Sequence, residues 1–162
     1  LNNGTQFSPQ FMENKLKFSP YIREAVVLGA ERPYIAAIVC IDFDIVGRWA
    51  ESRMITYTTY QDLSAKDQVY ELIRDEIQAI NETLPEETRI KRYALLFKEL
   101  DADDGELTRT RKVRRGVVSD RYGELIESLY SETERIDLTA CITYQDGRTR
   151  ELCGDMQIRD VY

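Results

Sequence analysis

The chain has 162 residues, 43% of them hydrophobic, and carries 22 Lys and Arg against 29 Asp and Glu, for a formal net charge of -7. This length and apolar content predict one compact domain with a core, and the acidic balance argues against a nucleic-acid binder, which needs a basic footprint over the whole domain. The chain has no histidine, which excludes Ser-His-Asp and Cys-His catalysis and imidazole metal ligands from this domain.

The first part of the chain predicts a helix followed by two strands. Ser8 before Pro9 is a helix start, because serine accepts an orphan amide and proline suits the first helical position. The helix is expected to run to about Phe18. Apolar runs at 24–29 and 34–41 predict two adjacent antiparallel strands, and their nearly continuous apolar character predicts burial on both faces.

The middle of the chain predicts two helices separated by a loop. Asp42 is placed to cap a short helix, and the Thr/Tyr-rich residues 55–62 are expected to form the loop. Ser64 with Asp67 resembles a capping box at the start of a longer helix that Pro85 ends. The apolar residues of this helix recur at helical spacing and are Val69, Leu72, Ile73, Ile77, Ile80 and Leu84.

A third strand, a charged loop and another helix follow. The strand is expected at 93–97, and it delivers the chain to an acidic turn at 99–104 and then to a basic run with five cations at 109–115. Apolar residues keep helical spacing again over 114–130. Lys112 is therefore expected just before a helix start, where backbone amides favour anions.

Residues 131–162 predict a β-hairpin. Apolar and polar residues alternate over 138–144, residues 145–148 supply a turn, and a second strand follows from Thr149. This tail has three possible roles: a structural cover for the domain, which we prefer, an edge for self-association, or a contact to a larger domain. The expected fold is α+β, with a small mixed or antiparallel sheet flanked by helices and an extra C-terminal hairpin.

The three cysteines, Cys40, Cys141 and Cys153, form an odd set without metal-ligand spacing. They therefore predict neither a zinc site nor a secreted disulfide framework. With residues 146–147 at the centre of the turn, Cys153 would oppose Ala140, so that the last two cysteines would lie on different faces and would not form a disulfide.

No apolar run approaches the roughly 20 residues of a membrane helix, and residues 1–4 do not have the form of a signal peptide. We expect a cytoplasmic domain without a transmembrane segment or a metal site of its own. Peripheral membrane contact is an alternative for a full-length protein.

The basic run at 109–115 has several interpretations. Such runs are commonly solvated surface, and nucleic-acid binding conflicts with the acidic balance of the chain. A calcium loop that starts at Asp101 needs glycine at position six and glutamate at position twelve. Those positions hold Glu106 and Lys112, so a calcium loop is not predicted.

The same run carries a family resemblance. The segment 105–115 resembles the C-terminal lysine motif of the adenylate-forming synthetases, in the form found in long-chain acyl-CoA synthetases, and Lys112 falls on the adenylation lysine of that family. The resemblance extends over about residues 1–130, because four shorter pieces follow one another in the order of the family: residues 3–9, 23–29, 32–37 and 89–93. It implies a division into a mobile C-terminal domain, 1–130, and an extension, 131–162.

The resemblance implies a two-step ligase. A carboxylate attacks ATP to give an acyl-adenylate and pyrophosphate, and coenzyme A then displaces AMP to give a thioester. The small domain rotates between the steps, presenting Lys112 to the first and a hairpin at Gly4 to the pantetheine channel in the second. ATP, coenzyme A and Mg²⁺ would act in the full-length enzyme together with a fatty acid and an N-terminal adenylation domain, and the isolated domain would bind none of them.

Some residues depart from the family pattern. Thr110 and Arg111 precede the lysine where many members have Ser-Gly, a variant seen in long-chain synthetases that favours a fatty-acid-type enzyme. Arg109 stands where proline is common in that variant. Leu1 follows the position of the hinge, so the chain is expected to be a fragment that is inactive alone.

Two other functions and two plainer residue roles stay open. The chain could belong to another adenylate-forming enzyme whose acceptor is a carrier-protein thiol, or it could be a non-catalytic interaction module of the same fold. Lys112 could be a solvated surface lysine, and Gly4 an ordinary turn glycine.

Overall fold

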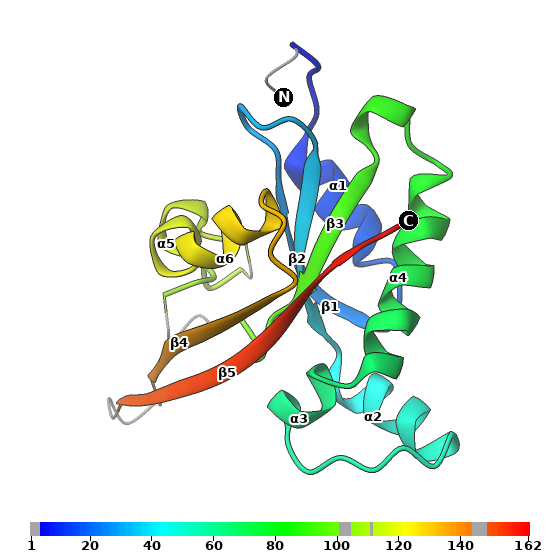
Figure 1. Cartoon of the computed structure of the whole chain (residues 1–162), viewed down its shortest axis with the longest axis vertical. Coiled ribbons are helices and arrows are strands. Elements are labelled where there is room, and N and C mark those ends of the chain that lie inside the picture. Colours follow the sequence, from blue (N-terminus) through cyan, green and yellow to red (C-terminus); the bar gives the residue numbers. More distant parts are fainter. Residues whose placement is uncertain (1–3, 101–104, 111, 144–148) are drawn as a thin grey trace.

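The computed structural model describes residues 4–100, 105–110, 112–143 and 149–162, with the backbone alone for 138–143, 149–153 and 155. Five strands form one mixed sheet in the order β1-β2-β3-β5-β4, with helices on both faces (Figure 1). The predicted α+β class with its C-terminal hairpin is confirmed. In chain order the elements are α1 (Pro9–Leu16), β1 (Ile22–Leu28), β2 (Ile35–Ile41), α2 (Phe43–Ser52), α3 (Tyr60–Ser64), α4 (Asp67–Asn81), the 3-10 helix η1 (Glu86–Thr88), β3 (Ile90–Leu95), α5 (Arg115–Arg121), α6 (Gly123–Leu129), β4 (Arg135–Thr143) and β5 (Thr149–Asp160).

Two helices begin at the caps that the sequence predicts. The hydroxyl of Ser8 accepts a hydrogen bond from the amide of Phe11 at 3.3 Å, with proline at the first position of α1. The carboxylate of Asp42 accepts one from the amide of Ile45 at 3.0 Å, which starts α2. Each cap satisfies an amide that the helix itself leaves without a partner.

Strand β2 lies between two hydrophobic cores and is buried along its whole length. Its odd-numbered residues from Ile35 to Ile41 join α1 and α4 in a first core. Its even-numbered residues, Ala36, Ile38 and Cys40, join α5 and α6 in a second core. Figure 1 shows these two helix pairs on opposite sides of the sheet. The continuous apolar run of β2 follows from this burial on both faces.

The C-terminal strand belongs to the central sheet. β5 pairs antiparallel with β4 from Gln157 to Thr149, and near its end it pairs antiparallel with β3, where Ala94 opposes Ile158. A side chain of α4 holds the end of the chain in place, because the side-chain amide of Gln78 donates to the main-chain carbonyl of Val161 at 2.6 Å. The tail therefore packs on the sheet of the domain.

The predicted register of the hairpin is wrong by one residue. Cys153 opposes Thr139, and Leu152 opposes Ala140. The connection between the ends of β4 and β5 is five residues long, whereas the prediction assumed a two-residue centre, and loop length sets the register. The prediction that Cys141 and Cys153 lie on different faces rested on the predicted register, so the observed register does not support it. The predicted turn at 145–148 and the cysteine side chains of the hairpin lie outside the described residues.

Four local predictions also need correction. Residues 55–62 are not all loop, because α3 begins at Tyr60, where Thr59 accepts from the amide of Asp62 at 3.1 Å. Ser64 does not cap α4 but donates to the carbonyl of Gln61 at 2.9 Å. The third strand starts earlier than predicted, and the helix predicted over 114–130 is two short helices, because the backbone of Tyr122 leaves the helical region. Apolar spacing does not reveal this break, since both helices face the same core.

Candidate functional site

Residues 106–114, the lysine hairpin, carry Lys112 on a narrow two-stranded turn. Leu107 and Val113 form an isolated antiparallel bridge, and the amide of Arg114 donates to the carbonyl of Glu106 at 2.8 Å. Thr108 holds both main-chain groups of Lys112. Its amide donates to the Lys112 carbonyl at 2.8 Å, and its hydroxyl accepts the Lys112 amide at 3.0 Å. The spacing of the motif thus fixes the backbone of the lysine.

The side of the hairpin that carries Lys112 lines a cavity of about 580 Å³ against α1. Lys112 itself is exposed. The walls come from α1 and its two ends, from β1, from the hairpin and from the first residue of α5. The lining residues are Ser8, Pro9, Gln10, Glu13, Asn14, Lys17, Glu24, Ala25, Thr110, Lys112, Val113 and Arg115. Segments about 100 positions apart in the sequence therefore meet around this lysine.

The other two cations of the cavity are paired with carboxylates. Lys17 lies 3.4 Å from Glu24, and Arg115 donates to Glu13. Within the described part of the chain, the ammonium of Lys112 makes neither an ion pair nor a hydrogen bond. Its charge is available to an anionic ligand, because no carboxylate of the described residues has to be displaced first.

Glu13 joins three elements around the cavity. Its side chain is only 8% exposed and accepts the amide of Val27 in β1 at 2.7 Å. Its other oxygen accepts from Arg115, the first residue of α5, whose guanidinium also donates to the Val27 carbonyl at 3.4 Å. The pairing of a glutamate in α1 with an arginine of the basic run has no signal in the sequence and was not predicted.

Gly4 is exposed and is not among the residues that line the cavity of Lys112. Its φ of +88° is one that side chains rarely adopt, and a Cβ built on it meets no atom within 4 Å. The glycine therefore satisfies a backbone requirement. Its predicted role in a hairpin stays a prediction, because residues 1–3 lie outside the described residues.

The helix after the lysine starts at Arg115, close to the predicted position. It has only seven residues, and Arg114 gives it no side-chain cap. We therefore assign no anion site to its amino end, and the positive charge near Lys112 comes from side chains.

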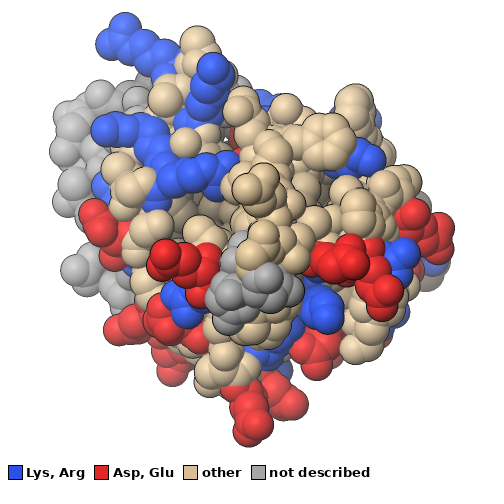
Figure 2. All heavy atoms as spheres, turned by 90° about the horizontal axis from the view of Figure 1, so that it is seen from above, with Lys and Arg blue, Asp and Glu red and all other residues tan. Residues whose placement is uncertain are grey.

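Exposed cations lie on the lysine hairpin and just after it, and they are Arg109, Lys112, Arg114, Arg115 and Arg121. Figure 2 shows Lys and Arg gathered on one part of a face, on the side of the molecule where α5 lies, while Asp and Glu lie mainly on the opposite part of that face, among uncharged residues and a few more cations. The net charge of -7 thus hides a local positive surface.

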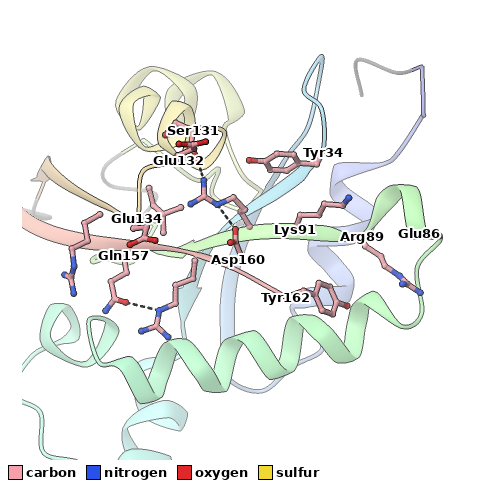
Figure 3. A pocket seen from close by; sticks show the side chains of 14 residues that line it. Tyr34, Glu86, Arg89, Lys91, Ser131, Glu132, Glu134, Gln157, Asp160 and Tyr162 are labelled. Atoms are coloured by element: carbon pink, nitrogen blue, oxygen red, sulfur yellow. Dashed lines mark hydrogen bonds and ion pairs between the residues drawn. The ribbon is translucent and has the colours of Figure 1, made fainter.

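A larger hollow of about 1160 Å³ opens at β3 and the end of β5 (Figure 3). Its arginines have partners, whereas the ammonium of the exposed Lys91 makes no ion pair or hydrogen bond with the described residues. Arg159 donates to Asp67 at 2.8 Å, and Arg89 donates to the carbonyl of Asn81 at 3.1 Å. Arg92 lies 3.0 Å from Asp160. These pairs hold the fold together, so size alone does not make this hollow the better candidate site.

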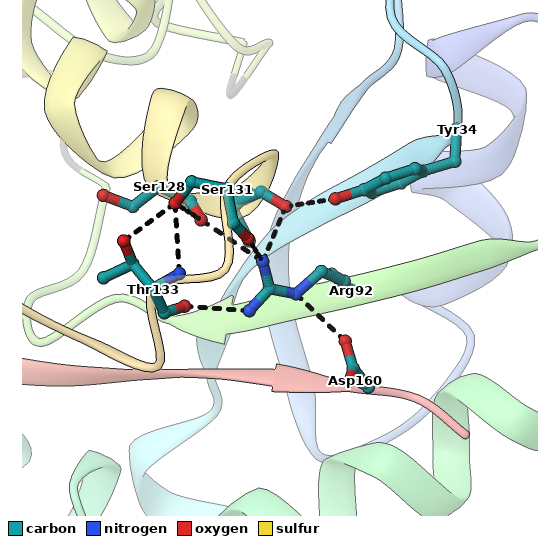
Figure 4. A network of polar contacts seen from close by, with 7 residues as sticks. Tyr34, Arg92, Ser128, Ser131, Thr133 and Asp160 are labelled. Atoms are coloured by element: carbon teal, nitrogen blue, oxygen red, sulfur yellow. Dashed lines mark hydrogen bonds and ion pairs between the residues drawn. The ribbon is translucent and has the colours of Figure 1, made fainter.

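Arg92 has a structural role that Figure 4 shows directly. Its guanidinium donates to main-chain carbonyls at the end of α6, among them Leu129 at 3.2 Å, and to that of Thr133 at 2.9 Å. Tyr34 donates to the same carbonyl of Leu129 at 2.7 Å. The last carbonyls of a helix need such donors, and Arg92 thereby fixes the connection from α6 to β4.

The profile of the family described as AMP-binding enzyme C-terminal domain matches residues 1–134. The chain belongs to this family. The match ends one residue before β4 begins at Arg135.

Curated relatives of this chain include long-chain-fatty-acid–CoA ligases. FadD15 of Mycobacterium tuberculosis is 28% identical over 130 residues, which cover 80% of this chain and 22% of that protein. ACSBG1 of Bos taurus is 25% identical over 147 residues, which cover 80% of this chain and 20% of that protein. The chain spans about a fifth of the length of these relatives.

Solved structures with the same fold come from carboxylic acid reductases. The adenylation domain of the carboxylate reductase from Mycobacterium chelonae has a TM-score of 0.64 and 25% identity, over 80% of this chain and 19% of that chain. The A-PCP didomain of the Segniliparus rugosus enzyme, in complex with AMP, has a TM-score of 0.59 and 21% identity, over 76% of this chain and 16% of that chain. The lysine hairpin therefore lies on the C-terminal domain of the adenylate-forming enzymes.

None of the helices in the described part of the chain combines the length and apolar character that a membrane crossing needs.

Proposed function

We propose that this chain is the C-terminal domain of a fatty-acid-type CoA ligase and that Lys112 is its adenylation lysine. The observation that carries the proposal is the contrast among the cations of the 580 Å³ cavity. Lys17 and Arg115 are paired with carboxylates, while Lys112 is exposed on a turn that hydrogen bonds from Thr108 hold in place. An exposed ammonium on a fixed backbone can bind a phosphate or carboxylate oxygen.

In the first step, the adenylation step, the carboxylate of the fatty acid attacks the α-phosphorus of ATP. A bond forms between a carboxylate oxygen and the α-phosphorus as the bond from that phosphorus to pyrophosphate breaks. Negative charge grows on the phosphate and carboxylate oxygens, and a positioned cation stabilises that charge where water is excluded. Lys112 would supply the cation, and the N-terminal adenylation domain would supply the pockets for ATP and the acid.

In the second step, the transfer step, the thiol of coenzyme A attacks the acyl carbonyl and AMP leaves. The domain would turn Lys112 away and bring the segment at Gly4 to the pantetheine channel. Gly4 does not line the cavity of Lys112, which supports a division of the two steps between two parts of the surface. In the same proposal, residues 1–130 form the mobile domain, residues 131–162 are its structural extension, and the enzyme acts in the cytoplasm.

Mg²⁺ accompanies ATP in such reactions and would be held outside this domain. Among the described residues, no three Cys, Asp or Glu side chains gather in a way that could hold a metal ion. No step is therefore assigned to the metal through the described residues of this chain.

A second candidate has the same adenylation step but passes the acyl group to a carrier-protein thiol. The likeness to the adenylation domain of a carboxylate reductase, at 25% identity, supports it, because the domain is then not confined to CoA ligases. Lys112 would have the same role in both enzymes. The third interpretation, a non-catalytic module, does not explain why the ammonium of Lys112 is available to an anionic ligand.

The acceptor decides between the two enzymes. The full-length protein should be incubated with ATP, Mg²⁺ and fatty acids of several lengths, together with either coenzyme A or a carrier protein that bears phosphopantetheine. We expect release of pyrophosphate and formation of acyl-CoA. Acylation of the carrier protein without acyl-CoA would favour the second candidate, and no pyrophosphate release with any acid would contradict both.

A further inference from the structure

Three polar side chains meet in the second core directly beneath the lysine hairpin. Lys98 is 5% exposed, Glu106 is fully buried and Tyr122 is 1% exposed. The ammonium of Lys98 donates to one oxygen of the Glu106 carboxylate, and the hydroxyl of Tyr122 donates to the other. Arg121 lies 3.8 Å from the second oxygen. The carboxylate of Glu106 is thus surrounded by donors inside an otherwise apolar core.

The Glu106 network of Lys98, Glu106 and Tyr122 is not explained by stability alone. Well-packed apolar residues commonly stabilise a core as well as a buried ion pair does, whereas removing one partner is strongly destabilising. Burial raises the pKa of Tyr122 far above its usual value, and the neighbouring Glu106 charge raises it further, so Tyr122 stays a donor. Such a network favours one geometry over its alternatives, because every other arrangement leaves a buried charge without its partners.

A short path of hydrogen bonds leads from this network to Lys112. The carbonyl of Glu106 accepts the amide of Arg114 at 2.8 Å, which closes the base of the hairpin. The bridge between Leu107 and Val113 follows. Thr108 then holds the amide and the carbonyl of Lys112. These bonds close the hairpin, so the direction in which it points depends on how its base is anchored.

We propose that Glu106 is a positioning residue for the adenylation step, which fixes the lysine hairpin so that Lys112 reaches the reacting phosphate. Glu106 acts through the backbone of the hairpin and does not touch the substrate. The inference rests on the proposed role of Lys112 and adds a residue that the sequence motif alone does not explain.

The test uses the full-length enzyme and measures the two steps separately. Fatty-acid-dependent exchange of pyrophosphate into ATP reports adenylation, and thioester formation from supplied acyl-adenylate reports transfer. Glu106→Gln keeps the volume of the side chain but removes the charge that holds Lys98. A misplaced catalytic group costs on the order of 10- to 100-fold in rate, so we expect a loss of that size in exchange, with transfer changed by less than about twofold.

A pair of tyrosine variants provides a second test with its matched control. Tyr122→Phe removes a hydroxyl from the Glu106 network, and Tyr70→Phe removes a buried hydroxyl from the first core, where it donates to the carbonyl of Gln157 at 3.0 Å. Both variants lose buried hydrogen bonds, but only Tyr122→Phe disturbs the base of the hairpin. We expect Tyr122→Phe to lower exchange relative to transfer, and Tyr70→Phe to leave the ratio of the two rates unchanged.

A double variant separates positioning from a general structural effect. In the Lys112→Ala background, Glu106→Gln should lower exchange no further, because residues that act through one group are not additive. Additive losses, or equal losses in exchange and transfer, would show a structural role and overturn the inference. If Glu106→Gln does not fold, Thr108→Val and Tyr122→Phe make the same comparison, since each breaks the path at another point.

The Lys112→Ala variant distinguishes failure of the proposed function from failure of the inference about Glu106. Unchanged exchange in Lys112→Ala contradicts the proposed function and the inference with it. A large loss in Lys112→Ala together with normal exchange in Glu106→Gln and Tyr122→Phe contradicts the inference and leaves the proposed function standing.

Discussion

The carboxylate of Glu13 in α1 accepts a hydrogen bond from the guanidinium of Arg115 in α5, although 102 positions separate the two residues. The same carboxylate accepts the amide of Val27 in β1 at 2.7 Å. One side chain thus fastens together the walls of the cavity in which Lys112 stands. The relative positions of α1 and the lysine hairpin depend on this contact.

Replacing Glu13 by alanine is expected to destabilise the chain by about 1–3 kcal/mol, the cost of leaving a buried amide without an acceptor. The control is Glu127→Ala, which removes a carboxylate that pairs with Arg32 on an exposed side chain, where ion pairs contribute little. Urea unfolding of both variants measures the difference. Equal stability of the two variants would show that the Glu13 contact does not hold the walls together.

Alkaline pH is expected to destabilise the chain in two stages. Burial raises the pKa of the Cys40 thiol from 9.0 to about 12 and that of Tyr70 from 10.0 to about 12. The folded state keeps both groups neutral, so their contributions are complete below the unfolded pKa values and are lost as pH rises toward 12. Stability should begin to fall near pH 9 and fall more steeply above pH 10.

Cys40→Ala isolates the first stage. A single group contributes at most about 1.4 kcal/mol per pH unit, so between about pH 9 and 10 the variant should lose less stability than the parent chain by up to that amount. Urea unfolding at several pH values measures the two slopes. Identical slopes would mean that Cys40 is not the group that titrates first.

Gly4 and Gly116 should respond to alanine with opposite signs. A Cβ at either position meets no atom within 4 Å, but only Gly4 has a positive φ, +88°. Gly4→Ala is therefore expected to cost about 1 kcal/mol through backbone strain. Gly116 lies in α5, where alanine should add about 0.5–1 kcal/mol of stability. Thermal unfolding checks both, and a neutral Gly4→Ala would show that the turn at Gly4 does not contribute to stability.

A bulky residue at Gly4 also tests the pantetheine channel. In the full-length enzyme, provided that the variant is folded, Gly4→Leu should retain pyrophosphate exchange and transfer acyl groups to coenzyme A poorly. Normal transfer would make Gly4 a turn residue only.

Features encoded by neighbouring residues could be predicted from the sequence. Ser8 and Asp42 cap helices that begin within three positions of them, and the apolar run of β2 shows burial on both faces. The caps and the strand need only local chemistry or periodicity. The motif around Lys112 is different, because it was matched to its family by resemblance, and its contiguous residues made that match possible.

Features that depend on distant segments could not be predicted. Nothing in the sequence pairs Glu106 with Lys98 or Glu13 with Arg115, since these contacts exist only once β3, α1 and α5 are in place. The break at Tyr122 was hidden because the apolar spacing continues through it into the same core. The hairpin register was missed because loop length, which composition does not specify, sets it.

The central claim is that Lys112 serves the adenylation step. In the full-length enzyme, Lys112→Ala should reduce fatty-acid-dependent pyrophosphate exchange by about 10²–10³-fold, the usual loss for one preorganised charge contact, while thioester formation from supplied acyl-adenylate stays nearly normal. The control is Lys91→Ala, an exposed lysine in the larger hollow, which should change neither rate. Exchange that is unaffected by Lys112→Ala, or lost equally in Lys91→Ala, would contradict the account.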